Sequence, residues 1–115
     1  MSRVFVVYEP VRVTDSGDVV PLFDLSPVLE FGKPEILLQH TQSALNTVPM
    51  VRKLNDKLKD FSDDDYLVPT GDPVAIAIAA MSAARANNGR VKLLRWEKRQ
   101  RRYYALDVDM SGREQ

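Results

Sequence analysis

The sequence predicts an α+β fold, with an antiparallel or mixed sheet of about four to five strands and two helices packed on one face. Three observations support this prediction. The chain opens with a β-branched and aromatic run at 3–8, two central segments (48–61 and 73–88) carry helix caps, and 91–109 has the pattern of a β-hairpin. Because 115 residues suit one hydrophobic core, we assign residues 1–115 to a single domain.

Composition narrows the class of protein. Hydrophobic residues make up 44% and charged residues 28% of the chain, the balance of a soluble globular domain. Because cysteine is absent, a disulfide scaffold, a cysteine nucleophile and a cysteine-built zinc site are excluded. The longest apolar stretch, 74–84, is about half a bilayer span, and the apolar run at 1–7 is too short for a signal peptide. We therefore expect a cytoplasmic protein that does not enter the membrane.

The N-terminal third is expected to be mostly β-structure. The run at 3–8 is apolar on both faces, so this strand should be buried on both sides of its sheet. Three further elements follow: a hairpin formed by 11–13 and 19–23 around a polar turn, one capped helical turn at 26–31, and a short strand at 35–39.

The first helix is expected at 48–61. Thr47 is a suitable N-cap, and Pro49 falls in the first turn, where its missing N–H has no cost. Apolar side chains recur at helical spacing on one side of this segment, which makes the helix amphipathic. Together with residues from the second helix and the last hairpin they form the predicted core: Met50, Leu54, Leu58, Phe61, Ile76, Ile78, Met81, Leu93, Leu106 and Val108.

The second helix is expected at 73–88. Asp72 is its N-cap, Pro73 takes the first helical position, and the Asn87-Asn88-Gly89 triplet stops it. Its interior, 74–84, is apolar nearly all round and rich in alanine, so it must be covered on every side. Packing between the sheet and the first helix would satisfy this need, as would a homodimer through the Ala-rich helix. A chain this small has little surface to cover such a helix, which favours the homodimer.

The C-terminal hairpin carries the main functional hint. A turn centred on Arg99-Gln100 pairs Trp96 with Tyr103, and period-two alternation then puts both rings on one face with Leu94 and Ala105. The other face, with Val91, Leu93, Leu106 and Val108, is assigned to the core. Residues 85–102 hold eight Arg and Lys side chains against Glu97 alone, although the whole chain has a formal net charge of zero.

Cations beside flat rings are typical of surfaces that bind phosphates and stack unpaired bases. We therefore predict nucleic-acid binding at Lys92, Trp96, Arg99, Arg101, Arg102 and Tyr103. The structural alternative is that the two rings pack inside the fold while the basic tip is simply solvated.

No pattern in the sequence supports catalysis, and we expect neither a cofactor nor a metal. The only histidine, His40, has no nucleophile near it in sequence. The 70–73 segment opens a helix as phosphate sites do, but Asp72 at the cap would repel an anion. The acidic run that starts at Asp60 lacks the glycine and the final carboxylate of a calcium loop. Its aspartates remain a possible docking surface for a protein: Asp63, Asp64 and Asp65.

Several stretches of the chain, at 51–54, 60–69, 71–73, 88–97 and 103–104, resemble small uncharacterised proteins encoded by tailed bacteriophages. Where that family suggests Trp-Asp-Arg, this chain has Trp96-Glu97-Lys98, which keeps the charge signs. The resemblance implies a viral protein that acts inside an infected bacterium, and it supplies no activity or catalytic residue.

Three functions stay open at this point. The first is a non-enzymatic accessory protein that binds nucleic acid in replication or transcription. The second is a protein-interaction module or inhibitor of a host factor, and the third is a structural or assembly protein that self-associates. Salt dependence separates them, because phosphate binding weakens steeply with salt whereas apolar self-contact does not.

Overall fold

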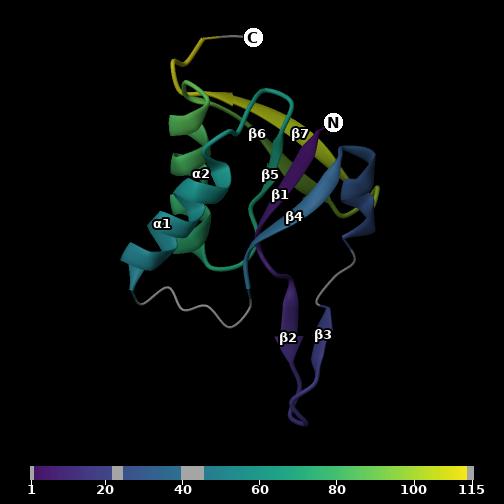
Figure 1. The fold of residues 1–115 in the computed structure, drawn as a ribbon. Coiled ribbons are helices and arrows are strands. Elements are labelled where there is room, and N and C mark those ends of the chain that lie inside the picture. The colour runs from purple at the N-terminus through teal and green to yellow at the C-terminus, as the bar shows by residue number, and fades with distance from the viewer. Residues whose placement is uncertain (1, 22–24, 40–45, 114–115) are drawn as a thin grey trace.

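The structure, a computed structural model, describes residues 2–21, 25–39 and 46–113. A five-stranded mixed sheet carries two helices on one face, and a separate two-stranded ribbon extends from it (Figure 1). The α+β class, with its two helices and its C-terminal hairpin, is therefore confirmed. The elements in chain order are β1 (Arg3–Tyr8), β2 (Val11–Val13), β3 (Val19–Pro21), the 3-10 helix η1 (Ser26–Glu30), β4 (Lys33–Leu38), α1 (Thr47–Leu58), β5 (Tyr66–Val68), α2 (Pro73–Ala86), β6 (Arg90–Glu97) and β7 (Arg102–Asp109).

The strand order is β4-β1-β5-β6-β7, with β1 at the centre of the first three strands. Neighbouring strands from β4 to β6 are parallel, and only β7 runs antiparallel, as the return strand of the hairpin. The ribbon β2–β3 matches the predicted N-terminal hairpin, although the end of that prediction at 22–23 lies outside the described residues. Strand β5 was not predicted, because three residues are too short to show a period.

The helix boundaries follow from caps. Asn46, not the predicted Thr47, caps α1: its side-chain oxygen accepts a hydrogen bond from Val48 N at 3.2 Å. The predicted cap of α2 is confirmed, since the Asp72 carboxylate accepts from Ala75 N at 3.1 Å. Helix α1 ends at Leu58, earlier than predicted, because the chain turns there.

The first core lies between the sheet and the two helices. β1 contributes Phe5 and Val7, while α1 contributes the predicted Met50, Leu54 and Leu58, all of them buried. The predicted Phe61 is also buried, with its ring centroid 5.9 Å from that of Phe5. This part of the predicted core is confirmed.

The α2 prediction needs correction. Ala75, Ala79 and Ala83 face the core and are fully buried, while Met81 is 64% exposed, so its place in the predicted core is wrong. The helix segregates its residues by size, because small side chains let its backbone approach the sheet and α1 closely. The apolar composition of α2 therefore does not require every side of the helix to be buried. The remaining members of the predicted core are half-buried: Ile76, Ile78, Leu93, Leu106 and Val108.

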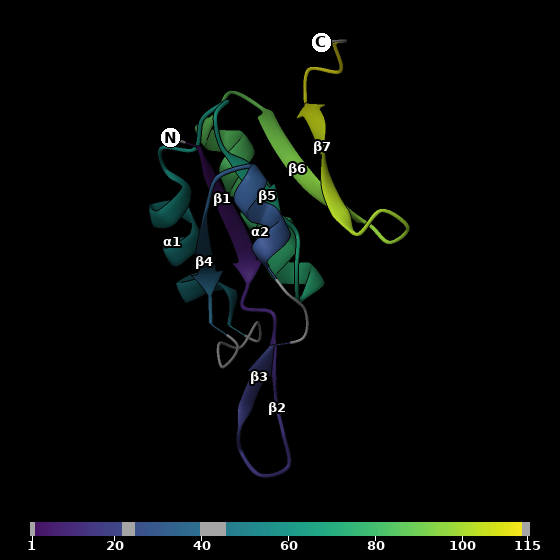
Figure 2. The same cartoon turned by 90° about the vertical axis from the view of Figure 1, so that its right-hand side faces the viewer.

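A second core covers the opposite face of the sheet, where the sequence predicted a half-apolar open face of the hairpin. Val4 and Val6 of β1 meet Val28 of η1, and Leu94 and Tyr103 of the hairpin complete the cluster. Leu94 is 1% exposed and Tyr103 4%, so both belong to the interior. Figure 2 shows η1 in front of the sheet, on the face away from α2. The prediction that β1 is buried on both sides is confirmed.

Candidate nucleic-acid interface

The hairpin has the predicted register, with Trp96 opposite Tyr103, Leu94 opposite Ala105 and Lys92 opposite Asp107. The ring centroids of Trp96 and Tyr103 are 5.0 Å apart and the ring planes meet edge to face at 64°. Tyr103 lies in the second core, and burial raises the pKa of its hydroxyl. Trp96 is 40% exposed, so the buried ring supports a second ring that still meets solvent.

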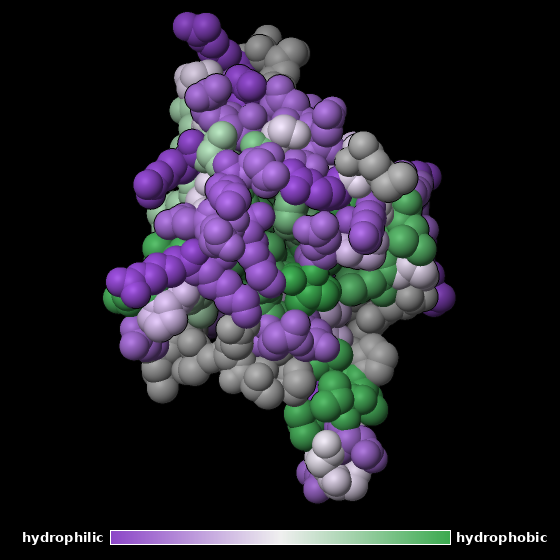
Figure 3. Space-filling model, in the orientation of Figure 1, coloured by the Kyte–Doolittle hydropathy of each residue, from purple (hydrophilic) through white to green (hydrophobic). Residues whose placement is uncertain are grey.

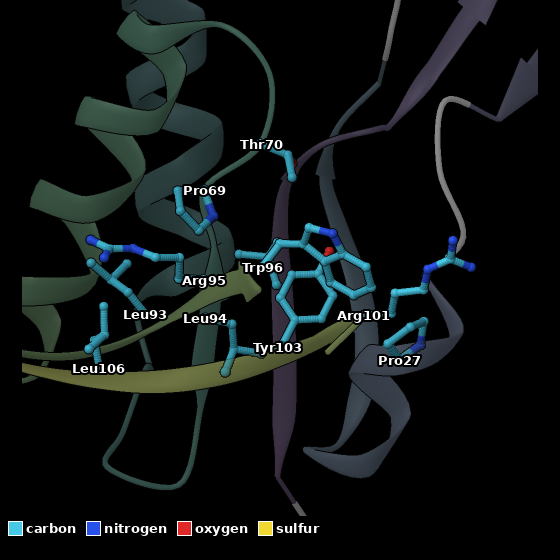
Figure 4. Close-up of a pocket in the computed structure, with 11 residues that line it drawn as sticks. Pro27, Pro69, Thr70, Leu93, Leu94, Arg95, Trp96, Arg101, Tyr103 and Leu106 are labelled. Atoms are coloured by element: carbon cyan, nitrogen blue, oxygen red, sulfur yellow. The ribbon is translucent and has the colours of Figure 1, made fainter. Parts of the chain in front are cut away.

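A hollow of about 810 Å³ opens beside these rings (Figure 4). It exists because β5 ends at Val68 and the chain turns away at Pro69, while β6 continues to Glu97. The end of β6 nearest the hairpin turn therefore has no parallel strand beside it, and side chains from both faces of the sheet line the space that is left open. The lining residues are Pro27, Val68, Pro69, Thr70, Leu93, Leu94, Arg95, Trp96, Arg101, Tyr103 and Leu106.

Two arginines border this hollow. Arg101 lies at the hairpin turn with a positive φ of 50°, a backbone conformation that residues other than glycine rarely adopt. Arg95 donates a hydrogen bond to the Tyr104 hydroxyl at 3.3 Å. Arg95 was not among the predicted site residues, because strict alternation put it on the core face. Pro69 and Thr70 were not predicted to contribute either, because their position depends on β5, which the sequence did not indicate.

The other predicted basic residues lie around the hollow without lining it. Arg99 is exposed at the turn, where Glu97 accepts a hydrogen bond from its backbone N–H at 2.9 Å. Arg102 pairs with Glu30 of η1 at 3.3 Å, which fastens the hairpin to the second core. Lys92 places its ammonium 5.2 Å from the centre of the Tyr66 ring, nearer the opposite end of β6. The structure thus brings Trp96, Tyr103 and Arg101 together and leaves the other three more dispersed.

The three aspartates predicted as a docking surface have different environments. Asp65 is 2% exposed and accepts hydrogen bonds from Arg3 Nη2 at 2.9 Å and from Ser62 N at 3.0 Å. Asp63 is exposed but pairs with Arg90 at 3.0 Å. Asp64 is exposed, and no ion pair holds its carboxylate within the described parts of the chain. Only Asp63 and Asp64 are therefore accessible to a partner.

Hydrogen bonds shift the pKa values of two of these carboxyls. Burial alone would raise the pKa of Asp65, but the hydrogen bonds from Arg3 and Ser62 outweigh burial and hold that pKa below its usual range. Hydrogen bonds from Arg90 and Asn87 likewise lower the pKa of Asp63. Both groups are therefore ionised at neutral pH and act as anchors within the fold.

The segment before α2 has a structural role. The Thr70 hydroxyl donates to Tyr8 O at 3.0 Å and accepts from Tyr8 N at 3.2 Å, which joins this loop to the end of β1. Across residues 2–21, 25–39 and 46–113, no cluster of three His, Asp or Glu side chains is placed to hold a metal ion. His40, predicted to be a loop histidine, lies outside the described residues.

Hydrophilic side chains cover most of the face shown in Figure 3, and hydrophobic surface gathers where the ribbon β2–β3 leaves the sheet. On that ribbon Val13 is 55% and Val19 51% exposed. No helix in the described part of the chain is long and apolar enough to cross a membrane.

Fold and site together define a small α+β protein whose twisted basic hairpin ends beside an aromatic hollow. Residues 2–110 match the model of the phage Pam3 gp32-like protein family, so the chain belongs to this bacteriophage family. The resemblance to phage proteins predicted from the sequence is thereby confirmed. Comparisons with curated proteins and with solved structures returned no match.

Proposed function

We propose that this protein is a non-enzymatic phage accessory protein that binds single-stranded nucleic acid through the tip of the β6–β7 hairpin. It would act in replication or transcription, in the cytoplasm of the infected bacterium. The observation that carries the proposal is the half-exposed Trp96 ring, supported from behind by the buried Tyr103 and bordered by Arg101.

The chemistry of single-stranded nucleic acid fits this arrangement. An unpaired base offers a flat apolar face that stacks on Trp96, and the adjoining phosphate is attracted by Arg101 and Arg95 at the border of the hollow. Arg99 and Lys98 at the exposed turn extend the positive surface along the strand. A duplex hides its base faces, so we expect it to bind more weakly than a single strand.

The first test is a titration of a fluorescently labelled oligonucleotide by anisotropy. We expect micromolar binding to the single strand at low salt, with Trp96→Ala losing about 1–3 kcal/mol, because one base stack is removed. Met81→Ala is the control: Met81 is an apolar side chain that is 64% exposed, but it lies on the outer side of α2 and does not line the hollow. Equal losses for both variants would contradict the proposed stacking surface.

Salt dependence tests the phosphate contact. Arg101→Ala should reduce the slope of log affinity against log salt by about one, whereas Arg52→Ala, on the exposed side of α1, should leave it unchanged. If the wild-type protein does not bind oligonucleotides at low salt, the nucleic-acid proposal fails.

The second candidate is a protein-interaction module or inhibitor of a host factor. Helix α2 favours it, because Val74 is 46% and Met81 64% exposed on its outer side. The accessible aspartates Asp63 and Asp64 offer such a partner a polar contact. A pull-down from host lysate separates the two proposals: a partner that survives nuclease treatment supports a protein target, and one lost with nuclease supports nucleic acid.

Self-association through the Ala-rich helix is the third candidate. It rests on the same outer residues of α2, since three alanines of the helix, Ala75, Ala79 and Ala83, are buried in the first core.

A further inference from the structure

Strand β7 forms one edge of the sheet, and no described element pairs with its outer side. It is eight residues long and pairs with β6 along its whole length. In an antiparallel strand the N–H and C=O groups of alternate residues point to one side, so β7 presents a row of backbone groups to solvent. An edge of this kind is a template for another strand.

The opposite edge of the sheet is protected. In β4, Pro34 has no N–H to offer. The Lys57 ammonium, from α1, donates hydrogen bonds to Leu37 O at 3.2 Å and to Ile36 O at 3.4 Å. Proline and lysine are common protections of an exposed edge, and β7 contains neither. Of the two edges of the five-stranded sheet, as far as the structure describes the chain, β7 is therefore the one without such protection.

Charge along β7 favours one kind of partner. The turn before the strand and its first residue are basic, with Lys98, Arg99, Arg101 and Arg102, while its far end carries Asp107 and Asp109. A second β7 in the antiparallel direction brings the basic start of each strand beside the acidic end of the other. Because the formal net charge of the chain is zero, two copies do not repel each other as wholes.

The side chains also match in this direction. Ala105 is exposed near the middle of the strand, and Tyr104 beside it is 37% exposed. With a two-fold axis at Ala105, each Tyr104 lies opposite Leu106 of the second copy, and each Asp107 lies diagonal to Arg101 of the second copy. Tyr104 and Leu106 then form an apolar pair across the axis, and Asp107 has a basic side chain of the second copy within diagonal reach.

We propose that β7 is a self-pairing edge through which two copies of this chain join antiparallel into one continuous sheet, with the two-fold axis at Ala105. This contact differs from the dimer through the Ala-rich helix, and it does not depend on nucleic-acid binding.

Two cysteine variants test the contact directly, because the chain contains no cysteine of its own. Ala105→Cys and Ala77→Cys introduce the same change at exposed alanines, one on β7 and one on the outer side of α2. A short bismaleimide should link two Ala105→Cys chains rapidly and leave Ala77→Cys monomeric. Faster linkage of Ala77→Cys would overturn the proposal in favour of the helix dimer.

Light scattering supplies a readout without cross-linking. The wild-type mass should rise from 13.0 kDa to twice that value across the micromolar range. Asp107→Arg should weaken the dimer at least about tenfold, because it sets like charges against the basic turn, whereas Asp64→Arg makes the same change away from β7 and should not. A wild-type protein that stays at 13.0 kDa, or equal effects of both variants, would overturn the proposal.

Discussion

The carboxylate of Asp65 holds together two parts of the chain that are distant in sequence. It accepts hydrogen bonds from the backbone N–H and the guanidinium of Arg3, at the start of β1, and from Ser62 in its own loop. Arg3 also reaches Asp60 at 3.4 Å. The loop between α1 and β5 is thereby fixed to the N-terminal end of β1.

Asp65→Asn should lower the free energy of unfolding by about 2 kcal/mol at neutral pH, because an amide replaces a carboxylate that accepts charged hydrogen bonds. Denaturant unfolding at fixed temperature measures the change. Asp64→Asn, in the same loop but exposed, should change the free energy by less than about 0.5 kcal/mol. Similar losses for both variants would show that Asp65 is no anchor.

Acid should remove this contribution. The pKa of Asp65 is lower in the folded protein than its usual value, so the carboxylate stabilises the fold above about pH 4 and loses this effect as pH falls through the folded pKa. The difference in unfolding free energy between wild type and Asp65→Asn should therefore shrink as pH falls below about 4.

The acidic run also shows that the environment of a single residue can be impossible to predict from the sequence. Asp63, Asp64 and Asp65 are chemically alike and adjacent, yet Asp65 is buried and ion-paired, Asp63 is exposed and ion-paired, and Asp64 is exposed with no ion pair within the described chain. Their partners Arg3 and Arg90 are remote in sequence, so no local pattern distinguishes the three. Local signals worked better where the partner was near, as with the Asp72 cap of α2.

At the scale of elements, Gly71 joins β5 to α2 where only glycine fits. Its φ is +94°, and a Cβ there would lie 2.4 Å from the Cβ of Tyr8. The loop must pass this close because Thr70 is hydrogen-bonded to the backbone of Tyr8.

Gly71→Ala should therefore destabilise the protein by more than about 2 kcal/mol, from backbone strain and a steric clash together. Gly17→Ala tests backbone strain without a steric clash, because Gly17 has a φ of +89° and no atom lies within 4 Å of the added Cβ. It should cost about 1 kcal/mol. Thermal unfolding of the two variants measures the difference, and equal shifts in Tm would refute the clash with Tyr8.

The β6–β7 hairpin could be predicted from the sequence, whereas β5 could not. Pairing between β6 and β7 is local, so turn position and alternation were enough to predict the register of every pair named in advance. Strand β5 is held by long-range parallel pairing with β1 and β6, for which its three residues carry no signal. The hollow depends on where β5 ends, so the candidate site could be predicted only on its hairpin side.

At the scale of the whole molecule, the two cores share their strands. Along β1 the side chains alternate, with Phe5 and Val7 in the first core and Val4 and Val6 in the second. On β5, Leu67 faces the first core and Val68 the second. Neither core can lose its packing without releasing strands that the other needs.

We therefore predict that residues 1–115 unfold as one cooperative unit. Leu54→Ala in the first core and Leu94→Ala in the second should each cost about 2–5 kcal/mol, because both leucines are buried. Each variant should shift two probes together: helical circular dichroism, which reports α1 and α2, and fluorescence of Trp96, the only tryptophan, which lies beside the second core. Coincident transitions are expected of a two-state domain of this size. If Leu94→Ala moved the Trp96 transition and left the helical transition in place, the two faces of the sheet would be separate folding units.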